Sequence, residues 1–560
     1  MRVNRTITSV FACSLAIAGL AGCSSSGSSG GGSSSGGGSS AQALTIGMPD
    51  GPMTDNNNPY ISSSASNQLG YRFMIYEPVA MVNAAQPAQA PAPWLATAWT
   101  WTNNYHSLTL TARTGVTFSD GTPMTAADIA YSFSIMKQYK ALNTYALDIS
   151  NVTTSGNTVT VSFGSSQFVH QDDVLSTLVI PKHIWSAMSN PTTDTVANPV
   201  GTGPYTLTSF TPQTTTLTVR KSYWQALPKV PKLLYTSYTA NDAQTTALSS
   251  GATQWSYVFI PNVQSVFEAK DPAHFKIWFP PTLSADGLWI NTTVAPFNNA
   301  NLRKAMSMVI DRGDIFTQGE SGYFKPEITS VTGLPTPAGN SFITSQFQGQ
   351  TASINVAGAK QLLTSNGFTY SGSTLKDPSG KPVTITLTDP AGWSDYQTDL
   401  SIISDNLASI GITATIDKAD QNAWTTAFAA GNFQAAMHWS NGGATPYDMY
   451  ENIMDGADLE PVGNSNATGN YGRFNDPAAT AALNAYANAA SDTARTAALN
   501  TLEQIMVNEV PMIPTSAGNV GAEYSTRNYT GWPSDANPYA GIQPTTEGAL
   551  EVVLHLTPTK

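Results

Sequence analysis

Cysteine and charge are both scarce in this sequence of 560 residues. Its two cysteines, Cys13 and Cys23, lie near the N-terminus, so the rest of the chain cannot form an internal disulfide and depends on core burial for stability. Only 11% of the residues are charged, whereas typical soluble domains have about 25%. The net charge is −12 and no basic patch is visible, so we expect no nucleic-acid partner.

Motifs for catalysis and for metal binding are also lacking. The six histidines form neither an HExxH pattern nor a close pair. The segment 170–173, His-Gln-Asp-Asp, could suggest a metal site, but a solvated polar turn explains it better. A GxSxG match at 32–36 falls in a Ser/Gly tract without the strand–turn–helix context of a nucleophile elbow. We therefore predict no catalytic residue, metal or other cofactor, with a secreted hydrolase as a distant alternative.

The N-terminal residues have the three parts of a secretory signal peptide. Arg2 and Arg5 precede an apolar stretch that is too short for a membrane span of ~20 residues, and small residues stand before Cys23. The four residues that end at Cys23, Leu-Ala-Gly-Cys, resemble the lipobox of bacterial lipoproteins. The resemblance implies that Cys23 carries a lipid and becomes the mature N-terminus. An ordinary secreted protein cleaved near Ala21 is the alternative.

Residues 24–40 are all Ser or Gly, a composition typical of a flexible tether. We predict a signal peptide at 1–22 and a lipid-anchored linker at 23–40. The protein is then exported and anchored to the membrane by its lipid, on the outer face of the cell membrane or in the periplasm. No later segment is apolar for long enough to span a membrane.

From residue 43 onward, strand-like and helix-like periodicities alternate, which predicts an α/β fold with mixed sheets. The residues 125–128, Thr-Ala-Ala-Asp, match a capping box that opens a helix. Gly411 stands where a left-handed residue ends a helix. Strands are expected at 44–47, 107–114, 158–163, 205–207, 216–219, 383–387 and 412–416, and helices at 356–363, at 400–410 and from a cap at Asn301.

Five segments in order resemble the peptide-type (family 5) extracellular solute-binding proteins of bacterial ABC importers. They are 113–132, 180–185, 199–205, 291–312 and 407–439. The resemblance implies a two-lobe clamshell that closes by a hinge, with mixed sheets and an additional subdomain inserted in the larger lobe. On that basis we predict core lobe I at 41–70, 198–290 and 505–560, the inserted subdomain at 71–197 and lobe II at 291–504.

The same resemblance implies the function. The protein would be the substrate-binding component of a peptide/oligosaccharide-family ABC import system, a monomer that captures a small solute outside the membrane and delivers it to the permease and ATPase complex. A structural lipoprotein of the cell wall is a third class, which the ordered family segments disfavour. The exact ligand, the permease and the type of cell envelope stay open.

The ligand prediction depends on one departure from the family pattern. Peptide-binding relatives carry an Asp three residues after the equivalent of Trp439, and this Asp pairs with the ligand's α-ammonium. This chain has Gly442 there, and Asp448 is the nearest acid. Because an unpaired buried ammonium is costly, we favour a neutral cello- or chito-type oligosaccharide, whose faces stack on aromatic rings; an oligopeptide or dipeptide is the alternative. The predicted ligand-binding residues are Trp439, Trp289, Asn291, Asn441, Trp255, Trp393 and Tyr60, with Trp424 as a further candidate.

Overall fold

The computed structural model describes residues 42–87, 89–457, 459–466 and 469–559. The predicted signal peptide, Cys23 and the Ser/Gly linker therefore lie outside the described residues. Within the described part of the chain, no helix combines the length and the apolar composition that a membrane crossing requires.

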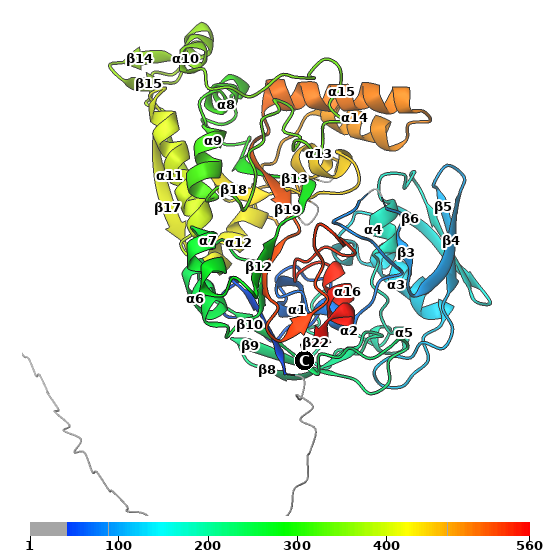
Figure 1. Cartoon of the computed structure of the whole chain (residues 1–560). Coiled ribbons are helices and arrows are strands. Elements are labelled where there is room, and N and C mark those ends of the chain that lie inside the picture. The colour runs from blue at the N-terminus through cyan, green and yellow to red at the C-terminus, as the bar shows by residue number, and fades with distance from the viewer. Residues whose placement is uncertain (1–41, 88, 458, 467–468, 560) are drawn as a thin grey trace, which may run out of the picture. The chain divides into compact units, whose positions relative to one another are not determined.

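A seven-stranded mixed sheet has the first described strand at its centre (Figure 1). In sheet order its strands are β12 (Phe275–Trp278), β20 (Ala522–Ser525), β11 (Trp255–Ser256), β1 (Leu44–Met48), β10 (Lys232–Ser237), β9 (Thr214–Val219) and β8 (Tyr205–Phe210). β1 pairs in parallel with both of its neighbours, so Ile46 lies between Tyr235 and Trp255. All three side chains are fully buried, which puts the core of this part of the chain on β1. The helices that follow these strands are α6 (Asn241–Ser250), α7 (Val263–Val266) and η2 (Glu268–Lys270).

A five-stranded mixed sheet is formed by strands that lie between β12 and β20 in the chain. Its strands, in order, are β17 (Thr413–Ala419), β16 (Thr384–Pro390), β18 (Ala435–Trp439), β13 (Pro281–Ile290) and β19 (Met512–Asn519). Leu288 and Trp289 of β13 belong to different core clusters, because helices cover both faces of the sheet. The elements around it are α8 (Ala300–Ser307), α9 (Arg312–Asp314), the π-helical turn η3 (Ile315–Gly319), α10 (Val356–Ser365), the hairpin β14 (Thr369–Ser371) and β15 (Thr374–Lys376), α11 (Ser394–Ala408), α12 (Gln421–Ala429), α13 (Tyr447–Met454), α14 (Pro477–Ala487) and α15 (Asp492–Glu509).

Two short connections join the seven-stranded sheet to the five-stranded sheet. β12 leads into β13 through residues 279–280, and β19 leads into β20 through residues 520–521. The Val520 amide donates to the Pro280 carbonyl at 3.2 Å. A side chain on Gly521 would collide with Phe279. The two connections therefore run side by side, as the hinge of a two-lobe protein requires.

A four-stranded antiparallel sheet completes the described fold. Its strands are β4 (Ala96–Thr102), β5 (Ser107–Ala112), β7 (Thr158–Phe163) and β6 (Ile149–Ser155), and α3 (Ala126–Gln138) packs on it. The predicted capping box is confirmed, since the Thr125 amide donates to the Asp128 carboxylate at 2.9 Å. The smaller elements are α1 (Ala65–Gln68), α2 (Arg72–Ile75), β2 (Ala80–Met81), β3 (Ala92–Pro93), η1 (Lys140–Leu142), α4 (Gln171–Leu175), α5 (Lys182–Trp185), β21 (Tyr529–Thr530), α16 (Gly548–His555) and β22 (Thr557–Pro558).

The predicted α/β class with mixed sheets is confirmed. Gly411 has φ +81° and follows α11, as the sequence predicts. One helix start differs, because α8 is capped by Asn299 and not by Asn301. The Asn299 side chain accepts hydrogen bonds from the amides of Asn301 and Leu302, so the earlier Asn satisfies the free amides of the first turn.

Candidate functional site

Trp439 is the most exposed of the predicted ligand-binding tryptophans. It ends β18, faces Asp286 across the β13–β18 pair, and is 47% exposed. The ring stacks on His438 with 3.9 Å between centroids and 21° between planes. One face of the indole is thus held by the protein, which leaves apolar ring surface available to a ligand.

Behind Trp439 a series of stacked rings continues into the core. His438 stacks on Phe428 of α12 at 4.3 Å, and Phe428 stacks on Phe433 at 4.8 Å. Burial lowers the pKa of His438 to about 4, so its ring is neutral at neutral pH. The stack fixes the orientation of the Trp439 side chain, so binding of a ligand to this ring costs little side-chain entropy.

Two further candidates, Trp393 and Trp424, join this aromatic group. Their ring centroids are 5.3 Å apart, and the ring of Trp393 is 6.3 Å from that of Trp439. The Trp393 indole N–H donates to the Pro49 carbonyl at 3.4 Å, and Pro49 directly follows β1. The aromatic group therefore lies where the carboxyl end of β1 meets the five-stranded sheet. In open α/β sheets, ligands bind outside the carboxyl ends of the strands.

The next residue, Asp50, is an acid that the sequence analysis missed. Burial raises its pKa to about 7, although a hydrogen bond to Gln421 opposes the shift. One carboxyl oxygen of Asp50 is buried without a hydrogen-bond partner among the described residues. No motif points to this acid, because only the contact between the β1 loop and α12 brings it to the site.

The loop after Trp439 leaves little room for a side chain at Gly442, the position where the resemblance implies an aspartate in peptide-binding relatives. A side chain on Gly442 would come within 2.8 Å of the Ser284 backbone nitrogen at β13, so an Asp there requires that strand to move. A side chain on Gly443 would collide with the carboxylate of Asp448. Asn441 is exposed, and its backbone N–H donates to Asn452. The loop thus presents the exposed amide side chain of Asn441 to a ligand, but it has no carboxylate at position 442.

The other predicted ligand-binding residues have internal partners. Trp289 is fully buried, and its indole donates to the His438 carbonyl at 3.0 Å. Trp255 is fully buried in the seven-stranded sheet and donates to the Ile542 carbonyl at 2.8 Å. Tyr60 is 7% exposed and packs edge-on against Trp185. The structure therefore brings together Trp439, Trp393 and Trp424 and leaves Trp255 and Tyr60 elsewhere; the role of each in ligand binding stays a prediction.

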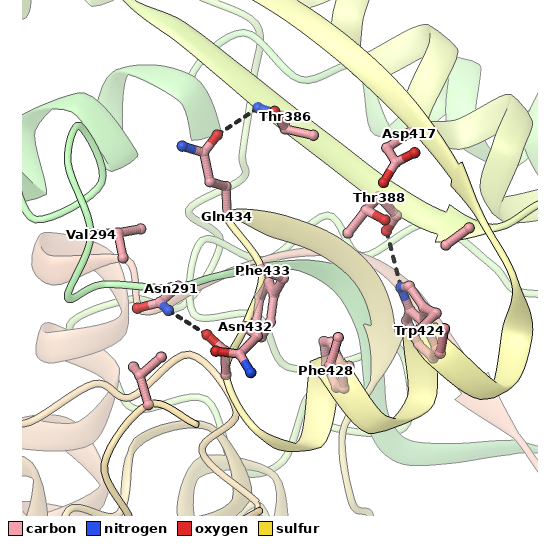
Figure 2. A pocket seen from close by; sticks show the side chains of 15 residues that line it. Asn291, Val294, Thr386, Thr388, Asp417, Trp424, Phe428, Asn432, Phe433 and Gln434 are labelled. Carbon is pink, nitrogen blue, oxygen red and sulfur yellow. Dashed lines mark hydrogen bonds between the residues drawn. The ribbon is translucent and has the colours of Figure 1, made fainter. Parts of the chain in front are cut away.

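A pocket of about 620 Å³ lies between α12 and the strands β16 and β17 (Figure 2). Trp424 and Phe428 line it as well as belonging to the aromatic group. The Trp424 indole donates to the Thr388 carbonyl at 3.2 Å. Asn291 also lines this pocket, with its amide donating to the Gly431 carbonyl at 2.7 Å. Asn291 is thus placed at the α12 pocket and not at the exposed face of Trp439.

A buried group of charges lies behind the strand end. Lys325 Nζ is 2.6 Å from Asp286, which also accepts a 2.6 Å hydrogen bond from the Tyr396 hydroxyl. Burial alone would lower the pKa of Lys325, but nearby carboxylates, Asp286 foremost, raise it well above its usual value. The lysine is therefore charged and neutralises the acid paired with Trp439. In the described part of the chain, no group of three or more His, Cys, Asp or Glu side chains is arranged to hold a metal ion.

Comparisons with known proteins agree on one family. The family model described as bacterial extracellular solute-binding proteins, family 5 Middle, matches residues 90–459. The glutathione-binding protein GsiB of Salmonella choleraesuis (strain SC-B67) is 27% identical over 347 residues, and the Escherichia coli O1:K1 / APEC protein of that name is 25% identical over 351 residues. Each alignment covers 58% of this chain and 60% of the relative. The chain thus matches less than two thirds of the length of these relatives.

Solved structures share the fold. A mannohexaose-bound periplasmic oligopeptide-binding protein from Thermotoga maritima superposes with a TM-score of 0.83 and 21% identity, over 93% of this chain and 99% of that one. The oligopeptide-binding protein AppA from Bacillus subtilis, in complex with a nonapeptide, gives 0.77 and 18%, over 93% of this chain and all of that one (100%). At these identities the likeness concerns the fold and not the ligand.

Proposed function

Because the chain belongs to the bacterial extracellular solute-binding proteins of family 5, we propose that it is the substrate-binding component of an ABC import system. In this role it binds a small solute outside the membrane and delivers it, unaltered, to the permease and ATPase complex. The side-by-side connections between β12–β13 and β19–β20 support a hinge between two lobes. The division into core lobe I, inserted subdomain and lobe II stays part of this proposal.

We further propose a neutral oligosaccharide of the cello or chito type as the ligand. The half-exposed ring of Trp439, held from behind by His438, carries this proposal, because it offers the flat apolar face on which a sugar ring stacks. The collision of any Gly442 side chain with Ser284 supports it, since a ligand ammonium meets no carboxylate there. The mannohexaose-bound neighbour provides an example of a sugar ligand on this fold.

A peptide is the second candidate. The glutathione-binding relatives and the nonapeptide-bound neighbour favour it. Asp50 would then be the first acid to test, because it follows Pro49, whose carbonyl accepts from the Trp393 indole, and has one oxygen unpaired among the described residues.

The test is titration calorimetry of the folded body, residues 41–560, against cello- and chito-oligosaccharides and against free-amine di- and tripeptides. We expect saturable 1:1 binding of an oligosaccharide, with an affinity that barely changes between low and high salt because the ligand is neutral. Binding of peptides alone would replace the sugar proposal with the peptide one. Conversion of a ligand into products in proportion to protein and time would contradict a non-enzymatic role.

A further inference from the structure

An enclosed ammonium group lies directly behind the strand end that carries Trp439. It belongs to Lys325, which is 5% exposed and lies 2.6 Å from Asp286. Asp286 is 2% exposed and is the residue paired with Trp439 across β13 and β18. Because both charges are removed from water, their attraction is strong and the loss of either one leaves the other uncompensated.

Further acids and two aromatic rings complete the surroundings of this ammonium. Its nitrogen lies 3.9 Å from an oxygen of Asp395 and 4.0 Å from one of Glu320. The ring centroids of Tyr396 and Phe324 lie 4.4 Å and 5.0 Å from it. Carboxylates and aromatic faces are the two kinds of group that bind alkylammonium cations. We call the five residues Asp286, Glu320, Phe324, Asp395 and Tyr396 the ammonium box.

The surroundings of Lys325 contain more buried carboxyl groups than its ion pair with Asp286 uses. Glu320 is fully buried, and neither of its carboxyl oxygens has a hydrogen-bond partner among the described residues. Asp399, on the next turn of α11 from Asp395, is fully buried and lacks such partners as well. Burial raises the pKa of both acids, and the positive charge of Lys325 opposes this shift.

The ammonium box adjoins the proposed ligand site. Tyr396 donates to Asp286 on one side, and its ring contacts Trp393 on the other, at 5.8 Å between centroids. Trp393 in turn contacts Trp439. Asp286 would therefore be open to a cation bound beside Trp439 if Lys325 did not already occupy it.

We propose that the ammonium box is an alkylammonium-binding site whose occupant is the chain's own Lys325, and that Lys325 thereby excludes cationic ligands from the site at Trp439. Lys325 acts through Asp286 and not by touching the ligand. The effect on selectivity rests on the proposed function, whereas the occupancy of the box by an alkylammonium group does not.

The first experiment replaces the tethered cation with a free one. Lys325→Ala removes three methylenes and the ammonium, which n-propylammonium restores. We expect the unfolding temperature of Lys325→Ala to rise saturably by a few degrees with n-propylammonium chloride, while 1-propanol and sodium chloride at matched concentration have no such effect. Wild type and Lys304→Ala, which removes a lysine of α8 that binds Asn508, should not respond. Equal responses of Lys325→Ala and wild type would overturn the proposal.

A second variant separates the cation from the cavity. Asp286→Asn combined with Lys325→Ala leaves the same space without the principal carboxylate, so n-propylammonium should not stabilise it. A response equal to that of Lys325→Ala would overturn the assignment of Asp286. If Lys325→Ala does not fold in sodium chloride, its recovery on refolding in n-propylammonium becomes the readout, and no recovery in either salt would also overturn the proposal.

Selectivity is measured separately by calorimetry with dialanine and N-acetyl-dialanine. We expect Lys325→Ala to bind dialanine at least about tenfold more tightly than wild type does, and to gain nothing for the acetylated form, which lacks the ammonium. No gain for dialanine would overturn the role in selectivity. Failure of the wild type to bind any oligosaccharide would count against the proposed function alone.

Discussion

The tryptophans predicted to bind ligand differ widely in the exposed fraction of their side chains. Trp439 is 47% exposed, whereas Trp289, three register positions further along the same pair of strands, is fully buried. An exposed ring that the protein already holds on one side can be removed without a cavity. A buried ring of that size leaves a cavity that costs about 3–5 kcal/mol on mutation to alanine.

Trp439→Ala should therefore weaken oligosaccharide binding and leave stability almost unchanged. Ring stacking contributes ~0.5–1.5 kcal/mol beyond area burial, and burial of the ring adds ~25 cal/mol/Å². We expect a loss of about 10- to 100-fold in affinity, measured by calorimetry. Leu227→Ala removes a side chain of similar exposure, 48%, between β9 and β10 and is the control. Unchanged affinity in Trp439→Ala would remove this residue from the ligand site.

Glu320 and Asp399, whose carboxyl oxygens have no hydrogen-bond partner among the described residues, give a prediction about pH. Burial raises the pKa values of Glu320 and Asp399 well above their usual range. In the unfolded chain these groups ionise near pH 4, so the folded state retains protons that the unfolded state loses, and stability falls as the pH rises above that value. Glu320→Gln has no such proton to lose. Its unfolding temperature relative to wild type should increase from pH 5 to pH 8, and Asp399→Asn should behave likewise.

Asp377 is the matched control for these acids. It accepts hydrogen bonds from Ser379 and Lys381, and the Ser379 hydroxyl contributes most to the lowering of its pKa. Its stabilising effect is thus present above the unfolded pKa and is lost at lower pH, the opposite sense from Glu320. Asp377→Asn should gain no stability between pH 5 and pH 8. A Glu320→Gln difference that is independent of pH would contradict the prediction for the buried acids.

At the scale of single elements, α3 shows how a local sequence pattern also serves tertiary packing. The Asp128 carboxylate accepts hydrogen bonds from the amide and hydroxyl of Thr125 at 2.9 Å each. Its other oxygen accepts from the Lys182 amide at 3.1 Å, where α5 begins. One carboxylate thus caps α3 and fixes the start of α5.

We expect Asp128→Ala to destabilise the protein more than Thr125→Ala does. Either alanine variant removes half of the capping box, and the loss of a cap side chain costs about 0.5–2 kcal/mol. Asp128→Ala also leaves the Lys182 amide without its acceptor, which costs about 1–3 kcal/mol more. Urea denaturation followed by circular dichroism measures both. Asp128→Asn, which keeps one acceptor oxygen, should fall between wild type and Asp128→Ala. Equal costs for the two alanine variants would show that the contact with α5 contributes nothing.

At the scale of the whole molecule, segment 165–173 docks on the helices beside the five-stranded sheet. His170 is buried, not part of a solvated turn, and its Nδ1 lies 3.0 Å from Asp173. Its Nε2 lies 3.6 Å from Glu451 of α13. Phe168, two residues earlier, carries the guanidinium of Arg495 on its ring at 3.8 Å. This docking connects the four-stranded sheet to the part of the chain that holds Trp439.

The charge of His170 makes this docking sensitive to pH. Burial alone would lower the pKa of His170, but Asp173 by hydrogen bonding, and Glu451 and Asp448 by charge, raise it to about 9. Since the unfolded pKa is about 6.5, the stabilisation is complete below that pH and is lost as the pH rises through 9. His170→Gln should flatten the loss of stability between pH 6.5 and 9.5, measured by thermal unfolding. His555→Gln, at an exposed position, should leave that slope unchanged.

Membrane attachment is the other prediction at this scale. If Cys23 carries the lipid, Cys23→Ala should leave the folded body intact and release it from membranes. Fractionation after a high-salt wash measures the change. Cys13→Ala, which changes the other cysteine, should remain with the membrane fraction. A Cys23→Ala protein that still sediments with membranes would contradict the lipid anchor.

The sequence by itself determined the family, the α/β class and much of the local structure. The capping box at Thr125 and the terminal Gly411 were correctly predicted, because a cap and a left-handed residue depend only on their neighbours in the chain. The strand at 158–163 was predicted with its observed bounds, since alternation on a half-buried sheet is visible in six residues. The prediction for Cys23 depends on its neighbours too, but lies outside the described residues.

Only the tertiary structure decided which aromatic and charged residues meet. The sequence gives no sign that Trp255 packs on Trp532 while Trp393 reaches Trp439, because exposure depends on contacts between distant segments. The sequence does not predict the pairing of Lys325 with Asp286 either. This pairing arises because tertiary packing brings β13, the segment that follows η3, and α11 to one place, and a buried charge is stable only where its partners are also buried.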